Sequence, residues 1–129
     1  MADVNDTIKN LNNTNDFTEE FEQEDIQNNK TMAILAYIGI LVLIPIFAAK
    51  ESKFARFHAN QGLVLLIIMV ANSVLWSIFS WIPVVKVIYA ILGSIVYACT
   101  VALMVIGIIN AAKGRAKELP VIGKIRILK

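Results

Sequence analysis

The sequence has few of the residues on which enzymes and disulfide-bonded proteins depend. Its 129 residues include one cysteine, Cys99, and one histidine, His58. A lone cysteine cannot form an intramolecular disulfide bond, and a cysteine nucleophile needs a base and an orienting group beside it. Cys99 lies in the middle of a long apolar run, whereas His58 lies at the edge of another. We therefore expect no enzymatic activity, no cofactor and no metal site, and interpret Cys99 as a packing residue.

Charged residues are missing from three long stretches of the chain. Residues 31–49, 61–81 and 87–109 contain no Asp, Glu, Lys, Arg or His, so the usual parts of a proton relay or an ion-coupled transporter are absent there. Each stretch has roughly the 20 residues that a helix needs to cross a bilayer. The chain is 57% hydrophobic, above the soluble average of about 45–50%. We expect an all-α integral membrane protein, in which residues 31–129 form a bundle of three transmembrane helices.

An acidic segment, residues 1–30, precedes the first apolar run. It contains eight acidic residues, seven asparagines and only two lysines. Such a composition buries too little apolar surface to offset the entropy of the chain, so we expect a disordered tail. The alternative is a short amphipathic helix that places Phe17, Phe21 and Ile26 against a partner.

The distribution of lysine and arginine predicts the orientation of three spans. Nine of these residues lie in the loop after the first run or in the C-terminal tail, residues 110–129, and three lie on the opposite side. Cytoplasmic loops carry an excess of Lys and Arg. We therefore expect a multi-pass protein of the cell membrane with its N-terminus outside and its C-terminus in the cytoplasm.

Polar and small residues inside the second and third runs predict how the helices pack. Asn72 would be costly in lipid unless it bonds to another helix, so we expect it to face the interior of the bundle. Ala90, Ser94, Ala98 and Ala102 recur every four residues and form one stripe along a helix. Small residues let helices approach closely, which predicts packing within the bundle, with a homodimer face as the alternative.

The segment between the first two runs is polar, basic and aromatic. Its basic and aromatic residues do not separate onto opposite faces at helical spacing, which favours a helix that begins near Ser52, with Ser52 as its N-cap, and continues into the second run. The C-terminal tail mixes basic and aliphatic residues, as interfacial segments do. We expect contacts with lipid headgroups, the C-terminal tail or a partner from Arg56, Phe57, His58, Asn60, Gln61, Lys124 and Arg126.

Two motifs and an Ile-Pro pair resemble a known family. The motifs are Arg-Phe-His-Ala-Asn-Gln-Gly at residues 56–62 and Glu-Leu-Pro-Val-Ile-Gly-Lys-Ile at residues 118–125, and the pair is Ile44-Pro45. Together they are similar to the small bacterial membrane proteins that include magnetosome MamF and MmsF, whose relatives are often labelled as similar to a chloroplast import component. The resemblance covers about residues 31–129. It implies a compact three-span module without enzymatic activity.

These observations predict a non-enzymatic membrane scaffold or assembly protein. Residues 50–60 and the C-terminal tail would present a basic cytoplasmic surface to lipid headgroups, a membrane-protein partner or a second copy, and no nucleic acid partner is expected. The alternative function is a subunit of a protein-translocation or channel complex, with a polar path lined by Asn72, Ser73, Ser77 and Ser94. An enzyme that acts on lipid through Arg56 and His58 would lack a second acid or a metal cluster.

Overall fold

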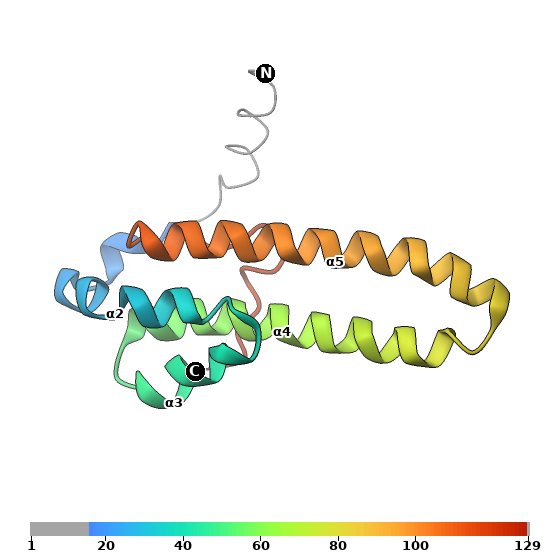
Figure 1. Ribbon diagram of the computed structural model, residues 1–129. Helices are drawn as coiled ribbons and strands as arrows, with labels where there is room; N and C mark the ends of the chain where they lie inside the picture. Colours follow the sequence, from blue (N-terminus) through green and yellow to red (C-terminus); the bar gives the residue numbers. More distant parts are fainter. Residues whose placement is uncertain (1–15, 129) are drawn as a thin grey trace, which may run out of the picture.

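A computed structural model describes residues 16–128 and shows two long antiparallel helices with shorter elements packed at one end (Figure 1). In chain order the elements are η1 (Thr18–Glu20), α2 (Gln23–Leu35), η2 (Gly39–Val42), α3 (Leu43–Ala48), α4 (Lys53–Phe79) and α5 (Pro83–Ala112). The described residues contain no strand and one isolated antiparallel bridge, between Asp16 and Lys117. The predicted all-α class is confirmed.

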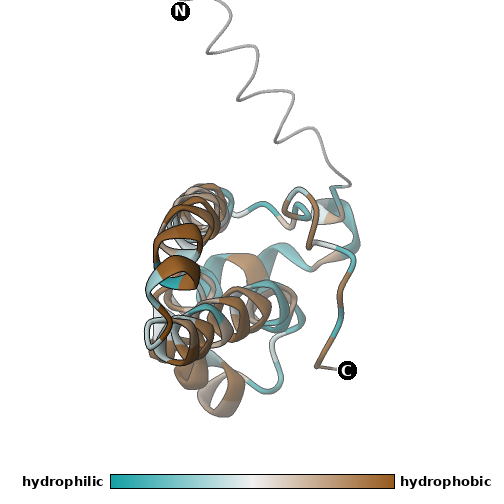
Figure 2. Ribbon diagram, turned by 90° about the vertical axis from the view of Figure 1, so that its right-hand side faces the viewer, coloured by the Kyte–Doolittle hydropathy of each residue, from teal (hydrophilic) through white to brown (hydrophobic). Residues whose placement is uncertain are grey.

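Helices α4 and α5 are long and apolar enough to cross a membrane. Their 27 and 30 residues span about 40 and 45 Å at about 1.5 Å per residue, more than the roughly 30 Å of bilayer hydrocarbon. Only 17% of the most apolar window of each helix is buried, so most of their hydrophobic side chains face outward. The ribbons of the two long helices are mostly in the hydrophobic colour (Figure 2). So large an apolar surface is typical of a membrane interaction. We therefore treat α4 and α5 as the membrane-crossing helices.

The first predicted span, residues 31–49, does not form a transmembrane helix. Helix α2 ends at Leu35, and Gly39 adopts the left-handed conformation with φ of 54°. The chain then turns back through η2 and the six-residue α3. Neither segment approaches the roughly 20 residues that a crossing requires. The prediction of three spans is therefore corrected to two among the described residues.

The charged residues separate the molecule into two parts. We refer to residues 16–62 and 110–128 as the head, and to residues 63–109 as the hairpin. Within the described residues, every Asp, Glu, Lys and Arg except Lys86 belongs to the head. Lys86 lies in the first turn of α5, which begins at Pro83. The turn that joins α4 to α5 is at the far end of the hairpin (Figure 1).

The start of α4 confirms the predicted cap. The Ser52 hydroxyl accepts a hydrogen bond from the amide of Ala55 at 3.0 Å. Asp25 on α2 reinforces this end, because its carboxylate accepts hydrogen bonds from the Ser52 hydroxyl at 2.5 Å and the Phe54 amide at 3.0 Å. A carboxylate at a helix N-terminus satisfies unpaired amides and favours the helix dipole. Asp25 therefore fixes α2 against α4.

Part of the acidic segment is ordered, contrary to the predicted disordered tail. The ring of Phe57 makes edge-on contacts with Phe17 and Phe21, at centroid distances of 6.0 and 5.8 Å, and Ile26 is buried. The disorder prediction is corrected for residues 16–30 because these apolar side chains find a partner within the same chain. Residues 1–15 lie outside the described residues.

The ordered acidic segment also lies beside the C-terminal segment. Its bridge between Asp16 and Lys117 is reinforced by a 2.9 Å hydrogen bond from the Phe17 amide to the Ala116 carbonyl. A membrane therefore cannot separate these two segments. The sequence analysis placed the N-terminal and C-terminal segments on opposite sides of the membrane because it expected three spans. The described residues contain two candidate spans, so that expectation no longer holds.

Asn72 lies at the contact between α4 and α5. Its side-chain nitrogen donates to the Gly93 carbonyl at 3.2 Å, and its oxygen accepts from the Tyr89 hydroxyl at 2.6 Å. This polar contact satisfies an amide that lipid could not.

The predicted small-residue stripe on α5 does not form this contact. Ala90 is half-buried, and Ser94, Ala98 and Ala102 are exposed. The buried positions of α5 are instead Gly93, Thr100, Gly107, Asn110 and Ala111. The first three are seven residues apart, a spacing that keeps one face of a helix against a nearly antiparallel partner, whereas a four-residue spacing drifts around the helix.

Gly62 permits the closest approach between α4 and the end of α2. A Cβ atom at this position would lie 1.7 Å from the carbonyl oxygen of Ala36 and 3.3 Å from Cγ2 of Val42. The first of these neighbours is backbone and cannot rotate away. The glycine that ends the motif at residues 56–62 is therefore required by packing.

Replacement of Gly62 by alanine tests this approach. We expect Gly62→Ala to lower the free energy of unfolding by about 1–3 kcal/mol, the usual cost of overpacking, because α2 must move away from α4. Thermal unfolding in detergent, followed by circular dichroism, measures the effect. Ala98→Ser on the exposed face of α5 is the control, and equal stability of the two variants would contradict the packing described here.

Candidate functional site

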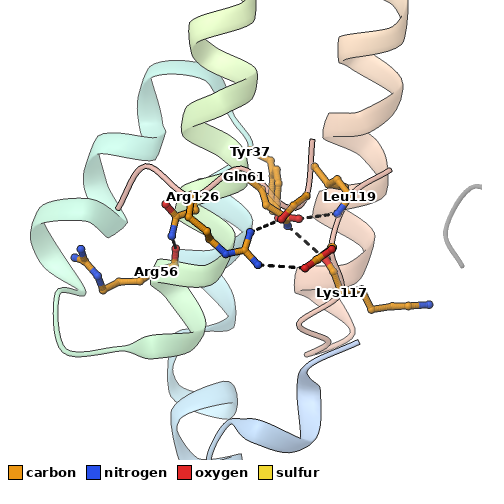
Figure 3. A network of polar contacts seen from close by, with 9 residues as sticks. Tyr37, Arg56, Gln61, Lys117, Leu119 and Arg126 are labelled. Atoms are coloured by element: carbon orange, nitrogen blue, oxygen red, sulfur yellow. Dashed lines mark hydrogen bonds and ion pairs between the residues drawn. The ribbon is translucent and has the colours of Figure 1, made fainter. Parts of the chain in front are cut away.

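The first turns of α4 bind the C-terminal segment, residues 113–128, which contains no helix or strand. Three α4 side chains make hydrogen bonds to its backbone, and we refer to His58, Asn60 and Gln61 as the clamp. His58 Nε2 donates to the Arg115 carbonyl at 2.8 Å. Gln61 Oε1 accepts from the Leu119 amide at 2.6 Å (Figure 3).

Asn60 binds the end of the same segment. Its Oδ1 accepts from the amides of Ile127 at 2.9 Å and Leu128 at 2.5 Å, and its Nδ2 donates to the Arg56 carbonyl at 3.2 Å. One amide side chain therefore ties the last described residues to the backbone of α4. The clamp binds backbone groups that lie outside any helix or strand and therefore need other hydrogen-bond partners.

Tyr37 connects the clamp to the turn after α2. Gln61 Nε2 donates to the Tyr37 hydroxyl at 2.7 Å, and this hydroxyl lies 2.5 Å from His58 Nδ1. A carbonyl only accepts, so Nε2 of His58 carries the proton that faces Arg115, and Nδ1 accepts from Tyr37. Burial raises the pKa of Tyr37 above the ordinary phenol value, so its hydroxyl retains that proton. These bonds fix the imidazole as one neutral tautomer.

The clamp is closed to water. The relative exposure of both His58 and Gln61 is 0%, and that of Asn60 is 5%. The rings of Phe54 and Phe57 pack edge-on against the imidazole, with centroids at 4.9 and 5.3 Å. Within the described residues, no buried side-chain nitrogen or oxygen lacks a hydrogen-bond partner. The clamp is therefore suited to positioning the C-terminal segment, because its polar atoms are already occupied.

The candidate contact residues consequently fall into two groups. Those that face the interior of the head are Phe57, His58, Asn60 and Gln61. The sequence analysis expected contacts with lipid headgroups, the C-terminal tail or a partner. In the structure His58, Asn60 and Gln61 contact the C-terminal tail.

The remaining candidates lie nearer the surface. The guanidinium of Arg126 lies 5.1 Å from the ring centroid of Phe57 and 3.5 Å from the carboxylate of Glu118. Lys124 is exposed and Arg56 is half-buried. Lys124 is therefore accessible to another molecule.

The sequence analysis missed Thr18 and Tyr37. The Thr18 hydroxyl accepts from the Ala116 amide at 2.9 Å, which binds the acidic segment to the tail. Tyr37 lies within an apolar run and was included in a span. The available signal was its hydroxyl, since a buried tyrosine usually needs a hydrogen-bond partner.

A polar groove of about 700 Å³ opens between the acidic segment and the loop before α4. Its charged and amide lining consists of Glu20, Glu22, Glu24, Asp25, Asn28, Asn29, Lys50, Glu51 and Lys53. Among the residues described, no three His, Cys, Asp or Glu side chains are arranged to hold a metal ion. The groove is therefore a surface of mixed charge.

The serines expected to line a polar path make bonds within their own helices. The Ser73 hydroxyl donates to the Met69 carbonyl at 3.0 Å, and the Ser77 hydroxyl donates to the Ser73 carbonyl at 3.1 Å. Ser94 donates to the Ala90 carbonyl at 2.5 Å. These local bonds satisfy each hydroxyl without a second helix.

Loss of a clamp side chain should release the tail. In Gln61→Leu the Leu119 amide stays buried without its acceptor, which costs about 1–3 kcal/mol, so we expect faster trypsin cleavage within residues 113–126. The digestion rate of detergent-solubilised protein, followed by mass spectrometry, measures this release. Asn72→Leu, which removes a polar contact in the hairpin, is the control. An unchanged tail cleavage rate in Gln61→Leu would show that the clamp does not hold the tail.

Comparison with known proteins agrees with the motifs. Residues 28–128 match the MamF_MmsF model, described as the magnetosome magnetite crystal formation protein family. The chain is 47% identical over 34 residues to magnetosome protein MamF of Paramagnetospirillum magneticum (strain ATCC 700264 / AMB-1). That match covers 26% of this chain and 31% of MamF, less than a third of the relative. No solved structure matches the chain. Because the family model covers most of its length, the chain belongs to the MamF/MmsF family.

Proposed function

We propose that the chain is a non-enzymatic membrane scaffold or assembly protein. It would act in the process for which its family is named, magnetosome magnetite crystal formation. The observation that carries this proposal is the separation of a charged head from a hairpin whose one charged residue is Lys86. Such a hairpin anchors the head at a membrane surface. The single histidine supports a non-catalytic role, because both nitrogens of His58 are bound within the head.

The proposed contact surface carries both signs of charge. The described head contains eight acidic and nine basic residues, because the acidic segment folds onto the same end as the tail. The exposed members include Glu19, Glu20, Glu22, Glu24, Lys50, Glu51, Lys53, Lys113 and Lys124. A surface attracted only to anionic headgroups would carry an excess of basic residues. The near balance of charge favours a protein partner that bears complementary charges.

Photo-crosslinking from the head tests the scaffold proposal. A photoreactive amino acid at Glu24 or Lys124, both exposed, should give a discrete protein adduct in the native host, identified by mass spectrometry. The same amino acid at Ile91, which is exposed on the hairpin, should give lipid adducts. Only lipid adducts from both head positions would contradict a protein-binding scaffold.

We also propose that the head faces the cytoplasm. Among the described Lys and Arg residues, nine lie in the head, and only Lys86 lies at the opposite end. The excess of positive residues on the cytoplasmic side of membrane proteins favours this orientation. It retains the cytoplasmic tail expected from the sequence and adds the ordered acidic segment to the same side.

Cysteine labelling tests the orientation. In a Cys99→Ser background, Trp81→Cys in the α4–α5 turn should react with a membrane-impermeant maleimide in intact cells. Lys124→Cys should react only after the membrane is permeabilised, because it lies in the head. Gel-shift detection of the labelled protein distinguishes the two. The opposite pattern would place the head outside.

A further inference from the structure

The segment that was expected to be the first span has one buried side and one exposed apolar side. Val42 and Pro45 are fully buried in the head. Facing outward are Ile40 and Phe47, with 64% and 67% exposure, together with the less exposed Ile38, Leu43 and Ile44. The buried side fixes the orientation of η2 and α3, so the exposed side chains form a defined surface.

This segment is flanked in the sequence by two lysines. Lys30 precedes and Lys50 follows nineteen residues that contain no Asp, Glu, Lys or Arg. The helical residues on the way in, 31–35, advance about 7 Å, and α3 returns about 9 Å, at about 1.5 Å per residue. The turn at Gly39 therefore lies on the order of 10 Å from the level of the flanking lysines. That depth is well short of a full crossing.

Three amides of the turn have local hydrogen-bond partners, which a segment within a membrane requires. The Tyr37 amide donates to the Ile34 carbonyl at 3.1 Å, and the Ile38 amide donates to the Leu35 carbonyl at 3.2 Å. The Leu41 amide donates to the Ile38 carbonyl at 3.0 Å. These three amides therefore keep a hydrogen-bond partner when the turn is removed from water.

The exposed surface belongs to a segment that borders α4, one of the two membrane-crossing helices. Both η2 and α3 pack against α4, whose length exceeds the hydrocarbon thickness by about 10 Å. The ammonium group of Lys50 lies 6.0 Å from the ring centroid of Phe47. A cation beside an aromatic ring at the edge of an apolar surface is suited to the headgroup boundary.

We infer that residues 36–49 form a re-entrant segment that inserts into the leaflet on the side of the head and does not cross the bilayer. Its exposed apolar side chains lie among the outer parts of the acyl chains, and Lys30 and Lys50 lie near the lipid phosphates. The occupant of this surface is lipid, because the surface is apolar and the segment packs against a helix that crosses the membrane. Interfacial segments insert by about 5–10 Å, which matches the depth of the turn.

Tryptophan fluorescence in liposomes tests this placement. The chain has two tryptophans, so Trp76→Phe with Trp81→Phe gives a background in which Phe47→Trp is the single reporter. The full chain is reconstituted into phosphatidylcholine liposomes that contain lipid brominated either near the headgroup or near the end of the acyl chain. Aqueous iodide reports exposure to water. Gln27→Trp, on an exposed polar position of α2, is the matched control in the head.

We expect lipid brominated near the headgroup to quench Phe47→Trp at least about twofold more than lipid brominated at the chain end, as interfacial depth requires. Iodide should quench Gln27→Trp but hardly affect Phe47→Trp. Ile40→Trp, nearer the turn, is a second reporter if Phe47→Trp does not fold. Equal iodide quenching of reporter and control, strongest quenching from the chain end, or no quenching by any brominated lipid would each overturn the inference.

Discussion

The hydrogen bonds that Gln61 makes with two other parts of the chain are the interaction on which the head depends. Its amide nitrogen donates to Tyr37, in the turn after α2, and its oxygen accepts from Leu119, in the C-terminal segment. The turn after α2 and the C-terminal segment thereby meet on the first turns of α4. Buried amides that lie outside helices and strands need such partners.

The clamp also explains why two distant motifs belong together. Gln61 and Leu119 are separated by 58 positions, yet their contact is direct. His58 and Asn60 bind the same segment before and after Leu119, at Arg115 and Ile127. The family motif at residues 56–62 is therefore a structural element whose polar side chains bind the tail and whose glycine admits α2. The exposed charged residues of the head, such as Lys53 and Lys124, are available for contact with other molecules, whereas the clamp residues are buried.

The sequence predicted those features that depend on local chemistry. Ser52 caps α4 as expected, and the two longest apolar runs form helices that are long and apolar enough to cross a membrane. The first run was misread because hydropathy alone does not distinguish a straight helix from a segment that reverses at Gly39. The acidic segment was misread because the entropy argument counted its own few apolar residues and could not include the aromatic partners that α4 supplies. Tyr37 joins the clamp only through this tertiary arrangement.

Amide hydrogen exchange in the detergent-solubilised full chain tests the central claim most directly. The clamp predicts that the amides of Leu119, Ile127 and Leu128 exchange far more slowly than those of an unstructured peptide, although they lie outside any helix. It further predicts that their protection disappears together when His58, Asn60 and Gln61 are replaced by alanine while the hairpin remains protected. Exchange of the three amides at the unstructured rate in the unaltered chain would contradict the account.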